Sequence, residues 1–293
     1  MLNRTRAVAV LTLVALALPG CGRRRVAAPT ADASAAAKIR AGLGSATAPA
    51  AAGDAAAPTG TGWATLKGRF TFGGSPSAPK ALVVDKDVEV CTAGGRKLLD
   101  RSLLVDPATK GIANVVVFAR KTSRVKGPVP AAAVVFDQKS CEFLTPVVAA
   151  RVGQTLEVKN SDTVGHNTNL AGTSFNQLIA AGGSTPYKID AETGMPTMIT
   201  CNVHPWMKAY GVFRKDGYVA LSAADGAFAI ADLPAGEPIE FQVWHERAGS
   251  GGAVGLAKPD LKWTPKGRFT ITLQPDEVRD LGTLEVPAAA LGG

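Results

Sequence analysis

Short runs of apolar residues, separated by clusters of turn-forming residues, fill the chain from Trp63 almost to its end. The first run, WATLKGRFTF, alternates apolar and polar side chains, as a half-buried β-strand does. The later runs are ANVVVFAR, AAVVFD, VVAARV, TLEVKNSD, TMITC, AYGVFRK, YVALSA, FAIADL, IEFQVWHE, RFTITLQ and GTLEV. Long helical periods are missing between them. The pattern therefore predicts an all-β chain.

The turns between these runs refine the fold class. Two Asp-Gly pairs, Asp216-Gly217 and Asp225-Gly226, lie between predicted strands and indicate β-hairpins. Strands at this spacing are typical of antiparallel sandwiches, and about 230 residues are enough for two of them. We therefore expect two β-sandwiches after residue 62.

The N-terminal residues 1–21 carry the pattern of a targeting signal. A basic start, MLNRTR, leads into the apolar run AVAVLTLVALAL, which is too short to span a bilayer. The stretch Leu18-Pro19-Gly20-Cys21 resembles a bacterial lipobox, in which Cys21 would be lipidated after cleavage. We expect an exported protein, either periplasmic or anchored to the outer membrane as a lipoprotein. An ordinary secretory peptide or an uncleaved anchor is the alternative.

Residues 22–61 consist mainly of Ala, Pro, Thr and Gly without apolar periodicity. Such a segment cannot bury a core, and we expect a disordered linker between the membrane and the folded part. A short alanine-rich helix around Ala35 to Leu43 is the alternative.

The formal net charge of +8 does not indicate a nucleic-acid partner. The basic residues after the N-terminal segments are scattered singly among acidic ones, without a stripe or interleaved aromatic residues. We therefore expect no nucleic-acid binding.

Candidate chemistry is concentrated in TCNVHPWMKAY, residues 200–210. Here Cys201, His204 and Met207 follow one another at intervals of three, in a chain with only three histidines. A thiolate, two imidazoles and a weak thioether are the ligands of a blue-copper electron-transfer centre. His166, in NSDTVGHNTN after a predicted strand, supplies the second imidazole. The sequence therefore predicts one type 1 copper site.

Two alternatives to copper remain open at this stage. Cys201 can be a disulfide partner, with Met207 in the core and both histidines on the surface. Zinc is the other, although a structural zinc site prefers more thiolates and a catalytic one prefers a carboxylate or a third imidazole.

The residues around these ligands suit electron transfer. Predicted strands flank the loop on both sides, so the ligands can be held at fixed distances in both oxidation states. Pro205 can stiffen the loop, and Trp206 can shield a metal from water.

The C-x2-H-x2-M loop and the His166-Asn167 pair resemble the cupredoxin family, specifically its amicyanin-like members. The resemblance implies that His166, Cys201 and His204 are equatorial copper ligands and that Met207 is the axial one. It also implies that Asn167 braces the cysteine loop and that His204 is the solvent-facing exit for the electron.

The resemblance extends over most of residues 63–285. Runs such as GIANVVVFAR, VVFDQKSCEF and DGAFAIADLPAGEPIEFQVWHE are similar to envelope proteins of the methylamine-utilisation or plastocyanin-like type. In that family a Greek-key cupredoxin sandwich is followed by a carboxypeptidase-regulatory-like or rhamnogalacturonan-lyase-type accessory sandwich, of transthyretin-like or fn3-like fold. We expect residues 62–130 to be an N-terminal β segment at the edge of either sandwich, 131–215 the cupredoxin core, and 216–293 the accessory sandwich. The cupredoxin module would then be inserted between NVVVFA and YVALSA.

Three further residues complete the expectations. Cys91 and Cys141 can form one disulfide in an oxidising envelope, and two separate buried thiols are the alternative. His245, inside a predicted strand, is expected to be a structural group or an interdomain contact rather than a third imidazole ligand.

These features together predict a membrane-tethered electron carrier that exchanges single electrons with redox proteins of the envelope and is not an enzyme. Three histidines are too few for a multicopper cluster, and no Ser-His-Asp motif, phosphate loop or dinucleotide fingerprint occurs. The accessory sandwich could bind glycan. The alternative function is a cell-surface carbohydrate-binding or structural sandwich protein without functional copper.

Overall fold

The structure is a computed structural model that describes residues 60–292. The targeting signal, Cys21 and nearly all of the predicted linker lie outside the described residues. No helix within residues 60–292 combines the length and the apolar content needed to cross a membrane.

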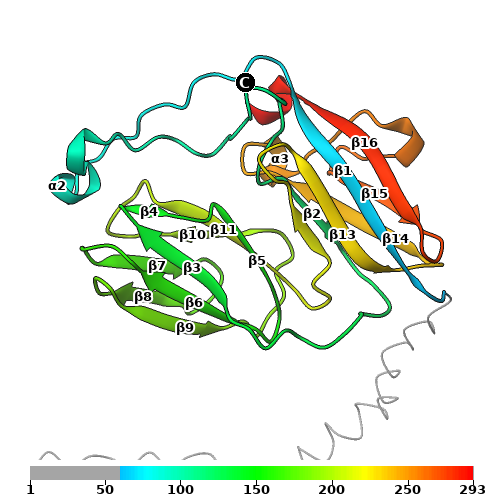
Figure 1. Ribbon diagram of the computed structural model, residues 1–293, viewed down its shortest axis with the longest axis horizontal. Helices are drawn as coiled ribbons and strands as arrows, with labels where there is room; N and C mark the ends of the chain where they lie inside the picture. Colours follow the sequence, from blue (N-terminus) through cyan, green and yellow to red (C-terminus); the bar gives the residue numbers. More distant parts are fainter. Residues whose placement is uncertain (1–59, 293) are drawn as a thin grey trace, which may run out of the picture. The chain divides into compact units, whose positions relative to one another are not determined.

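The predicted all-β class is confirmed: the described residues form four sheets that pack as two sandwiches (Figure 1). The outer sandwich has two sheets around one core that contains Phe70 and Phe241. Its sheets are, in spatial order, β13 (Ala227–Pro234), β1 (Trp63–Gly73), β16 (Val278–Pro287), and β12 (Val219–Leu221), β2 (Val116–Ala119), β14 (Pro238–Trp244), β15 (Arg268–Thr272).

The inserted sandwich encloses a second core, with Phe136 and Leu156 on one sheet and Ile199 and Phe213 on the other. Its first sheet has the order β5 (Val147–Arg151), β11 (Lys208–Arg214), β10 (Thr197–Thr200), β7 (His166–Leu170), β8 (Asn176–Ile179). Its second sheet has the order β4 (Glu142–Phe143), β3 (Val134–Lys139), β6 (Thr155–Asn160), β9 (Ser184–Lys188).

Helical segments are short. They are α2 (Val88–Cys91), α3 (Gly249–Gly252) and the 3-10 turns η1 (Ala93–Gly95), η2 (Pro259–Leu261) and η3 (Ala288–Leu291).

One sandwich is inserted in the chain between two strands of the other. β1 and β2 precede the inserted sandwich, but β1 pairs with β13 and β16, and β2 pairs with β12 and β14. Both strands therefore lie inside sheets of the outer sandwich. The chain leaves that sandwich after β2 and returns to it at β12.

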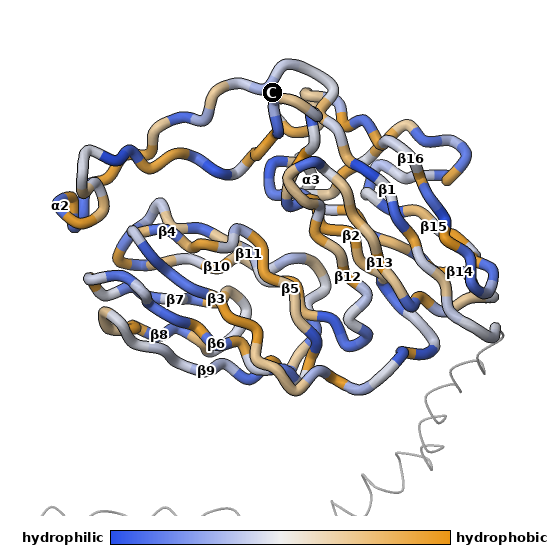
Figure 2. Tube along the Cα trace, in the orientation of Figure 1, coloured by the Kyte–Doolittle hydropathy of each residue, from blue (hydrophilic) through white to orange (hydrophobic). Residues whose placement is uncertain are grey.

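Apolar and charged contacts join the two sandwiches. A third buried cluster contains Val116 and Trp244 from the outer sandwich and Val147 and Val212 from the inserted one, and Figure 2 shows hydrophobic residues along β2. Arg214, only 4% exposed, donates from Nη2 to the carbonyl of Ala119 at 2.9 Å. The end of β11 is therefore held against the end of β2.

The sandwiches are antiparallel only in part, whereas the strand spacing predicted antiparallel ones. Among the described residues, β1 runs parallel to β16, β3 to β6, and β5 to β11. Parallel neighbours need a crossover connection rather than a tight turn. Between β3 and β6 the chain makes that crossover through β5, which belongs to the opposite sheet.

The two Asp-Gly pairs form turns, but the predicted hairpins are wrong. Gly217 and Gly226 both have positive φ, of 75° and 85°. A Cβ at Gly226 would lie 2.0 Å from the carbonyl oxygen of Phe70, so this turn needs glycine for space as well. In both cases the two flanking strands enter different sheets. The dipeptide therefore marked the turn, whereas the pairing was decided by the cores on which the strands pack.

An extended segment connects β1 to β2 and lies against the inserted sandwich. We call residues 80–100 the arm. Its two sides pair at Ala81 and Leu99, and its tip carries α2, which Figure 2 shows as largely hydrophobic. Cys91 and Leu98 are buried in the core of the inserted sandwich. The arm therefore belongs to the connection between β1 and β2 of the outer sandwich but packs on the inserted sandwich.

Candidate metal centre

The four predicted ligands lie at the ends of neighbouring strands of the inserted sandwich. β10 pairs with β7 on one side and with β11 on the other. His166 begins β7, Cys201 follows β10, and His204 and Met207 lie in the loop before β11. The Cys201 N–H donates to the carbonyl of Met207 at 3.2 Å, and the Met207 N–H donates to that of His204 at 2.9 Å. The loop is therefore held in one tight conformation.

Three of the ligand side chains face one another. The Nδ1 atoms of His166 and His204 are 2.9 Å apart, and Cys201 Sγ is 3.8 Å from His204 Nδ1. The three residues, none more than 2% exposed, form a candidate metal-binding group with donor atoms within 4.8 Å. Donors bound to one ion at about 2.0 Å for nitrogen and 2.3 Å for sulfur lie at comparable separations. Met207 is 2% exposed and belongs to the hydrophobic core of the inserted sandwich, as Cys201 does.

The cysteine sulfur accepts two backbone hydrogen bonds. The N–H of Asn167 lies 3.3 Å from Cys201 Sγ, and the N–H of His204 lies 3.4 Å from it. The two donors hold the sulfur in one position beside the imidazoles. Cys201 is a free cysteine, so its sulfur is available as a ligand.

Two carboxylates hold the outer nitrogens of the imidazoles. His166 Nε2 lies 2.9 Å from Asp162 Oδ2, and His204 Nε2 lies 2.9 Å from Asp87 Oδ2. Burial acts to raise the pKa of Asp162, but hydrogen bonds from His166 and from the Cys141 N–H outweigh it and lower that pKa. Burial also lowers the pKa of His166, which favours the neutral ring.

These contacts determine where the imidazole lone pairs point. An ionised carboxylate only accepts hydrogen bonds, so each Nε2 must carry the proton that it donates. In a neutral imidazole the other nitrogen, Nδ1, then holds a lone pair. The lone pairs of His166 and His204 therefore face each other beside a thiol sulfur, an arrangement that a cation or a shared proton relieves.

Asn167 spans the base of the loop. Its Oδ1 accepts the N–H of Asn202 at 3.1 Å, and its Nδ2 donates to Asn176 Oδ1 at 2.7 Å. The side chain thus connects β8, β7 and the residue after Cys201.

Pro205 is exposed, and Trp206 is half-buried with its ring 5.1 Å from that of His204. Trp206 Nε1 donates to the carbonyl of Cys141 at 3.0 Å. The residues that line a cavity of about 560 Å³ include Trp206 and Met207. Trp206 therefore lies between part of the centre and solvent.

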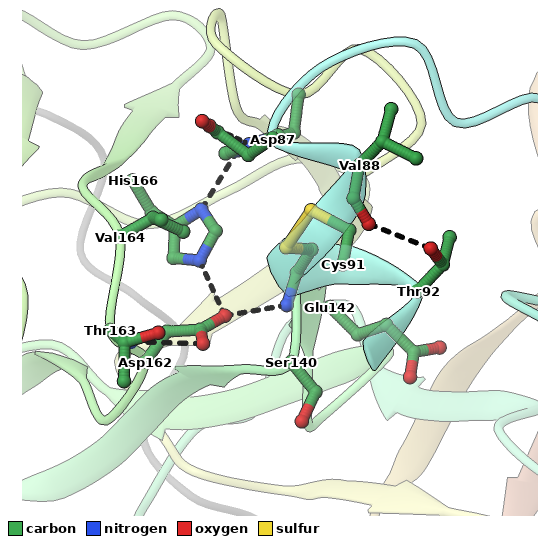
Figure 3. Close-up of a disulfide and its surroundings, with 12 residues drawn as sticks. Asp87, Val88, Cys91, Thr92, Ser140, Glu142, Asp162, Thr163, Val164 and His166 are labelled. Carbon is green, nitrogen blue, oxygen red and sulfur yellow. Dashed lines mark hydrogen bonds and ion pairs between the residues drawn. A yellow bond between two sulfur atoms is a disulfide. The ribbon is translucent and has the colours of Figure 1, made fainter. Parts of the chain in front are cut away.

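Cys91 and Cys141 form a disulfide, with an S–S distance of 2.06 Å. It joins the tip of the arm to the turn between β3 and β4 and lies beside the centre (Figure 3). The sulfur atoms and a nitrogen of His204 lie within 4.8 Å of one another.

The expectation that His204 faces solvent is wrong, because its exposed fraction is 0%. Asp87 of the arm lies against its outer nitrogen Nε2, and the ring of Trp206, from the loop itself, lies 5.1 Å from the imidazole. The side chain of Asp87 is 42% exposed, so this carboxylate stands between the imidazole and solvent.

Asp162 and Asp87 were not predicted as site residues from the sequence. A signal for Asp162 was present, because a carboxylate four residues before a candidate histidine ligand is a natural partner for its second nitrogen. Asp87 had no local signal. Its position four residues before Cys91 becomes informative only once the disulfide to Cys141 is known.

His245 lies outside this group of ligands. It is 2% exposed, and its Nδ1 accepts the N–H of Arg247 at 3.2 Å. Burial lowers its pKa to about 4, so the ring is neutral at neutral pH. It occupies a structural position at the end of β14.

Comparisons with known proteins give distant structural likenesses. No family model matches the chain, and no curated protein matches it. A copper(I) form of an amicyanin variant is 15% identical, with 33% of this chain and 98% of that one covered, at a TM-score of 0.26. Amicyanin from Paracoccus versutus is 20% identical over 33% of this chain and 97% of its own, also at 0.26. A copper-containing nitrite reductase from Thermus scotoductus is 17% identical. The match covers 32% of this chain and 25% of the reductase, at a TM-score of 0.26.

Proposed function

We propose that the inserted sandwich holds one type 1 copper ion and that the protein carries single electrons. His166, Cys201 and His204 would be the principal ligands, with Met207 as a weaker fourth. The observation that carries the proposal is the pair of imidazole nitrogens 2.9 Å apart beside the Cys201 sulfur.

The donor set favours copper over the alternatives. One thiolate, two imidazoles and a thioether combine soft and intermediate donors, which suits copper in both common oxidation states. A structural zinc site would have more thiolates, and a catalytic one would keep a position for water. Here the donors are almost fully buried, as a site that excludes water requires.

The chain's own residues supply the conditions for electron transfer. Bound copper would contribute a one-electron redox couple. The paired strands β7, β10 and β11 fix the ligand positions, and the two carboxylates keep both Nδ1 atoms directed inward. A centre held in this way needs little rearrangement when its charge changes.

The proposal includes the cell envelope as the location. The Cys91–Cys141 disulfide supports an oxidising compartment, and the apolar run before Cys21 supports export. We propose a lipid-anchored electron carrier, rather than an enzyme, that exchanges electrons with envelope redox proteins. Glycan binding by the outer sandwich is a separate proposal that rests on the sequence resemblance.

The test is a copper(II) titration of the purified protein, followed by visible absorption and electron paramagnetic resonance. Cys201→Ser removes the thiolate and is the main control. A stoichiometric, intense thiolate-to-copper absorption band, lost in Cys201→Ser, is expected. Folded protein that binds no copper in this way would sink the electron-carrier proposal and favour the surface-binding alternative.

A further inference from the structure

The arm supplies the outer hydrogen-bond partner of one proposed ligand. Asp87 Oδ2 lies 2.9 Å from His204 Nε2, while the Asp87 carbonyl accepts the N–H groups of Val90 and Cys91, both at 2.9 Å. Asp87 has a φ of 43°, a left-handed conformation that aspartate adopts more readily than most residues. The carboxylate is therefore aimed by the backbone of the tip of the arm.

The disulfide is connected to both imidazoles through carboxylates. On one side, the N–H of Cys91 donates to the backbone carbonyl of Asp87, whose side-chain carboxylate lies against His204 Nε2. On the other side, the N–H of Cys141 donates to Asp162 Oδ2 at 2.6 Å, and the same oxygen lies 2.9 Å from His166 Nε2 (Figure 3). The two cysteines of the disulfide thus hydrogen-bond to the two residues, Asp87 and Asp162, whose carboxylates contact the two imidazoles.

Backbone hydrogen bonds join the two sides of the arm at its base, with the N–H of Leu82 on the carbonyl of Leu98 and that of Asp100 on the carbonyl of Lys80. Leu98 also anchors the arm by its burial in the core of the inserted sandwich. A contact between a partly exposed carboxylate, such as that of Asp87, and an imidazole is weak by itself, because the entropy lost in ordering the side chain offsets most of the attraction. The covalent link of Cys91 to Cys141 and the contact of Arg96 with the carbonyl of Ser140 hold the tip against the inserted sandwich.

We propose that the arm is a disulfide-held cover of the metal centre and that Asp87 is a positioning residue for His204. Asp87 keeps the proton on Nε2 and the lone pair of Nδ1 directed at the metal, and the arm closes the route by which solvent or a chelator reaches that ligand. This inference rests on the proposed function, because a cover that retains a metal requires that the centre binds one.

The experiment compares copper release from the full chain and its variants. Copper-loaded protein is mixed with excess EDTA, and the decay of the thiolate absorption gives the rate. Asp87→Ala is expected to release copper about 10- to 100-fold faster, the range by which outer hydrogen-bond partners alter metal affinity. Asp87→Asn should remain close to the wild type, because its amide oxygen still accepts from Nε2. Asp85→Asn, an exposed carboxylate two residues away, is the matched control.

The disulfide is tested with Cys91→Ala combined with Cys141→Ala, after circular dichroism has established that the variant is folded. Copper release should accelerate, and adding Asp87→Ala should accelerate it little further, because both changes act on the same contact. The copper hyperfine splitting should change in Asp87→Ala but not in Asp85→Asn. A wild-type rate and spectrum in Asp87→Ala would overturn the positioning role, and a wild-type rate in the cysteine variant would overturn the role of the disulfide.

A metal-free measurement separates this inference from the proposed function. Long-range proton–nitrogen NMR spectra report which ring nitrogen of His204 carries a proton. A protonated Nε2 in the wild type and in Asp87→Asn, with mixed tautomers in Asp87→Ala, supports positioning even in a protein that forms no blue centre. Identical His204 tautomers in the wild type, Asp87→Asn and Asp87→Ala would overturn the inference, even if the copper titration supports the proposed function.

Discussion

Asp87 and His204 are 117 positions apart in the sequence, and the carboxylate of one lies 2.9 Å from the imidazole of the other. Asp87 belongs to the connection between β1 and β2 of the outer sandwich, whereas His204 belongs to the inserted sandwich. The candidate metal centre is therefore completed by a residue from outside the module that supplies its ligands. The two modules share a site as well as a packed interface.

Asn167→Ala should destabilise the metal-free protein by about 1–3 kcal/mol, because it removes two part-buried hydrogen bonds, to the N–H of Asn202 and to Asn176 Oδ1, each worth about 0.5–1.5 kcal/mol. Urea denaturation measures the change. Asn169→Ala, on the same strand but only partly buried, is the control and should cost less. An equal loss of stability in both variants would show that Asn167 acts through strand propensity and not through the brace.

Met207→Leu should change the stability of the metal-free protein by less than about 1.5 kcal/mol, because the volume of this buried side chain is nearly conserved. The reduction potential of the copper-loaded protein should rise, because loss of a thioether donor weakens support for copper(II) more than for copper(I). Protein-film voltammetry measures the potential. Met198→Leu, at a methionine that is 42% exposed on β10, should leave it unchanged. If both variants keep the wild-type potential, Met207 is a core residue and not a ligand.

Much of the strand pattern was predictable, and the failures have physical causes. Runs such as TLEVKNSD and AYGVFRK became β6 and β11 because their apolar residues enter the core. β7, β8 and β9, with the sequences HNTNL, NQLI and STPYK, escaped prediction. Much of β8 and β9 is exposed, and β7 buries polar side chains that serve the candidate centre. Periodicity of apolar residues cannot identify such strands.

In the candidate site, too, the features set by local sequence were predictable and those set by tertiary packing were not. The spacing of Cys201, His204 and Met207 is local, so the sequence alone indicated it. The burial of His204 is not local, because it depends on an arm that reaches the loop only through tertiary packing. The resemblance to proteins with an exposed histidine ligand predicted the opposite.

Replacing Cys91 and Cys141 together with alanine should lower the free energy of unfolding by about 4 kcal/mol. The disulfide spans 50 residues, and a loop of that length restricts the unfolded chain by roughly this amount. Urea denaturation of the metal-free variant under non-reducing conditions measures the loss. Reduction of the wild type by a phosphine, with Cys201 blocked beforehand, should produce a similar shift. A loss below about 1 kcal/mol in both cases would mean that the unfolded chain is already constrained near these positions.

His245 should make the folded state sensitive to moderate acid. Its pKa is lowered from the ordinary value of 6.5 to about 4, chiefly because burial disfavours the charged ring. The folded state therefore binds this proton less readily than the unfolded state. The stabilising contribution of the neutral ring is complete above pH 6.5 and is lost as the pH falls toward 4.

The difference in unfolding free energy between the wild type and His245→Gln isolates this contribution, because the shifted carboxylates Asp216 and Glu246 remain in both proteins. The difference should fall by about 3 kcal/mol between pH 7 and pH 4, the equivalent of the shift in pKa. Urea denaturation across this range measures it. A difference that stays constant with pH would show that water reaches the ring in the folded protein, and that the acid sensitivity arises elsewhere.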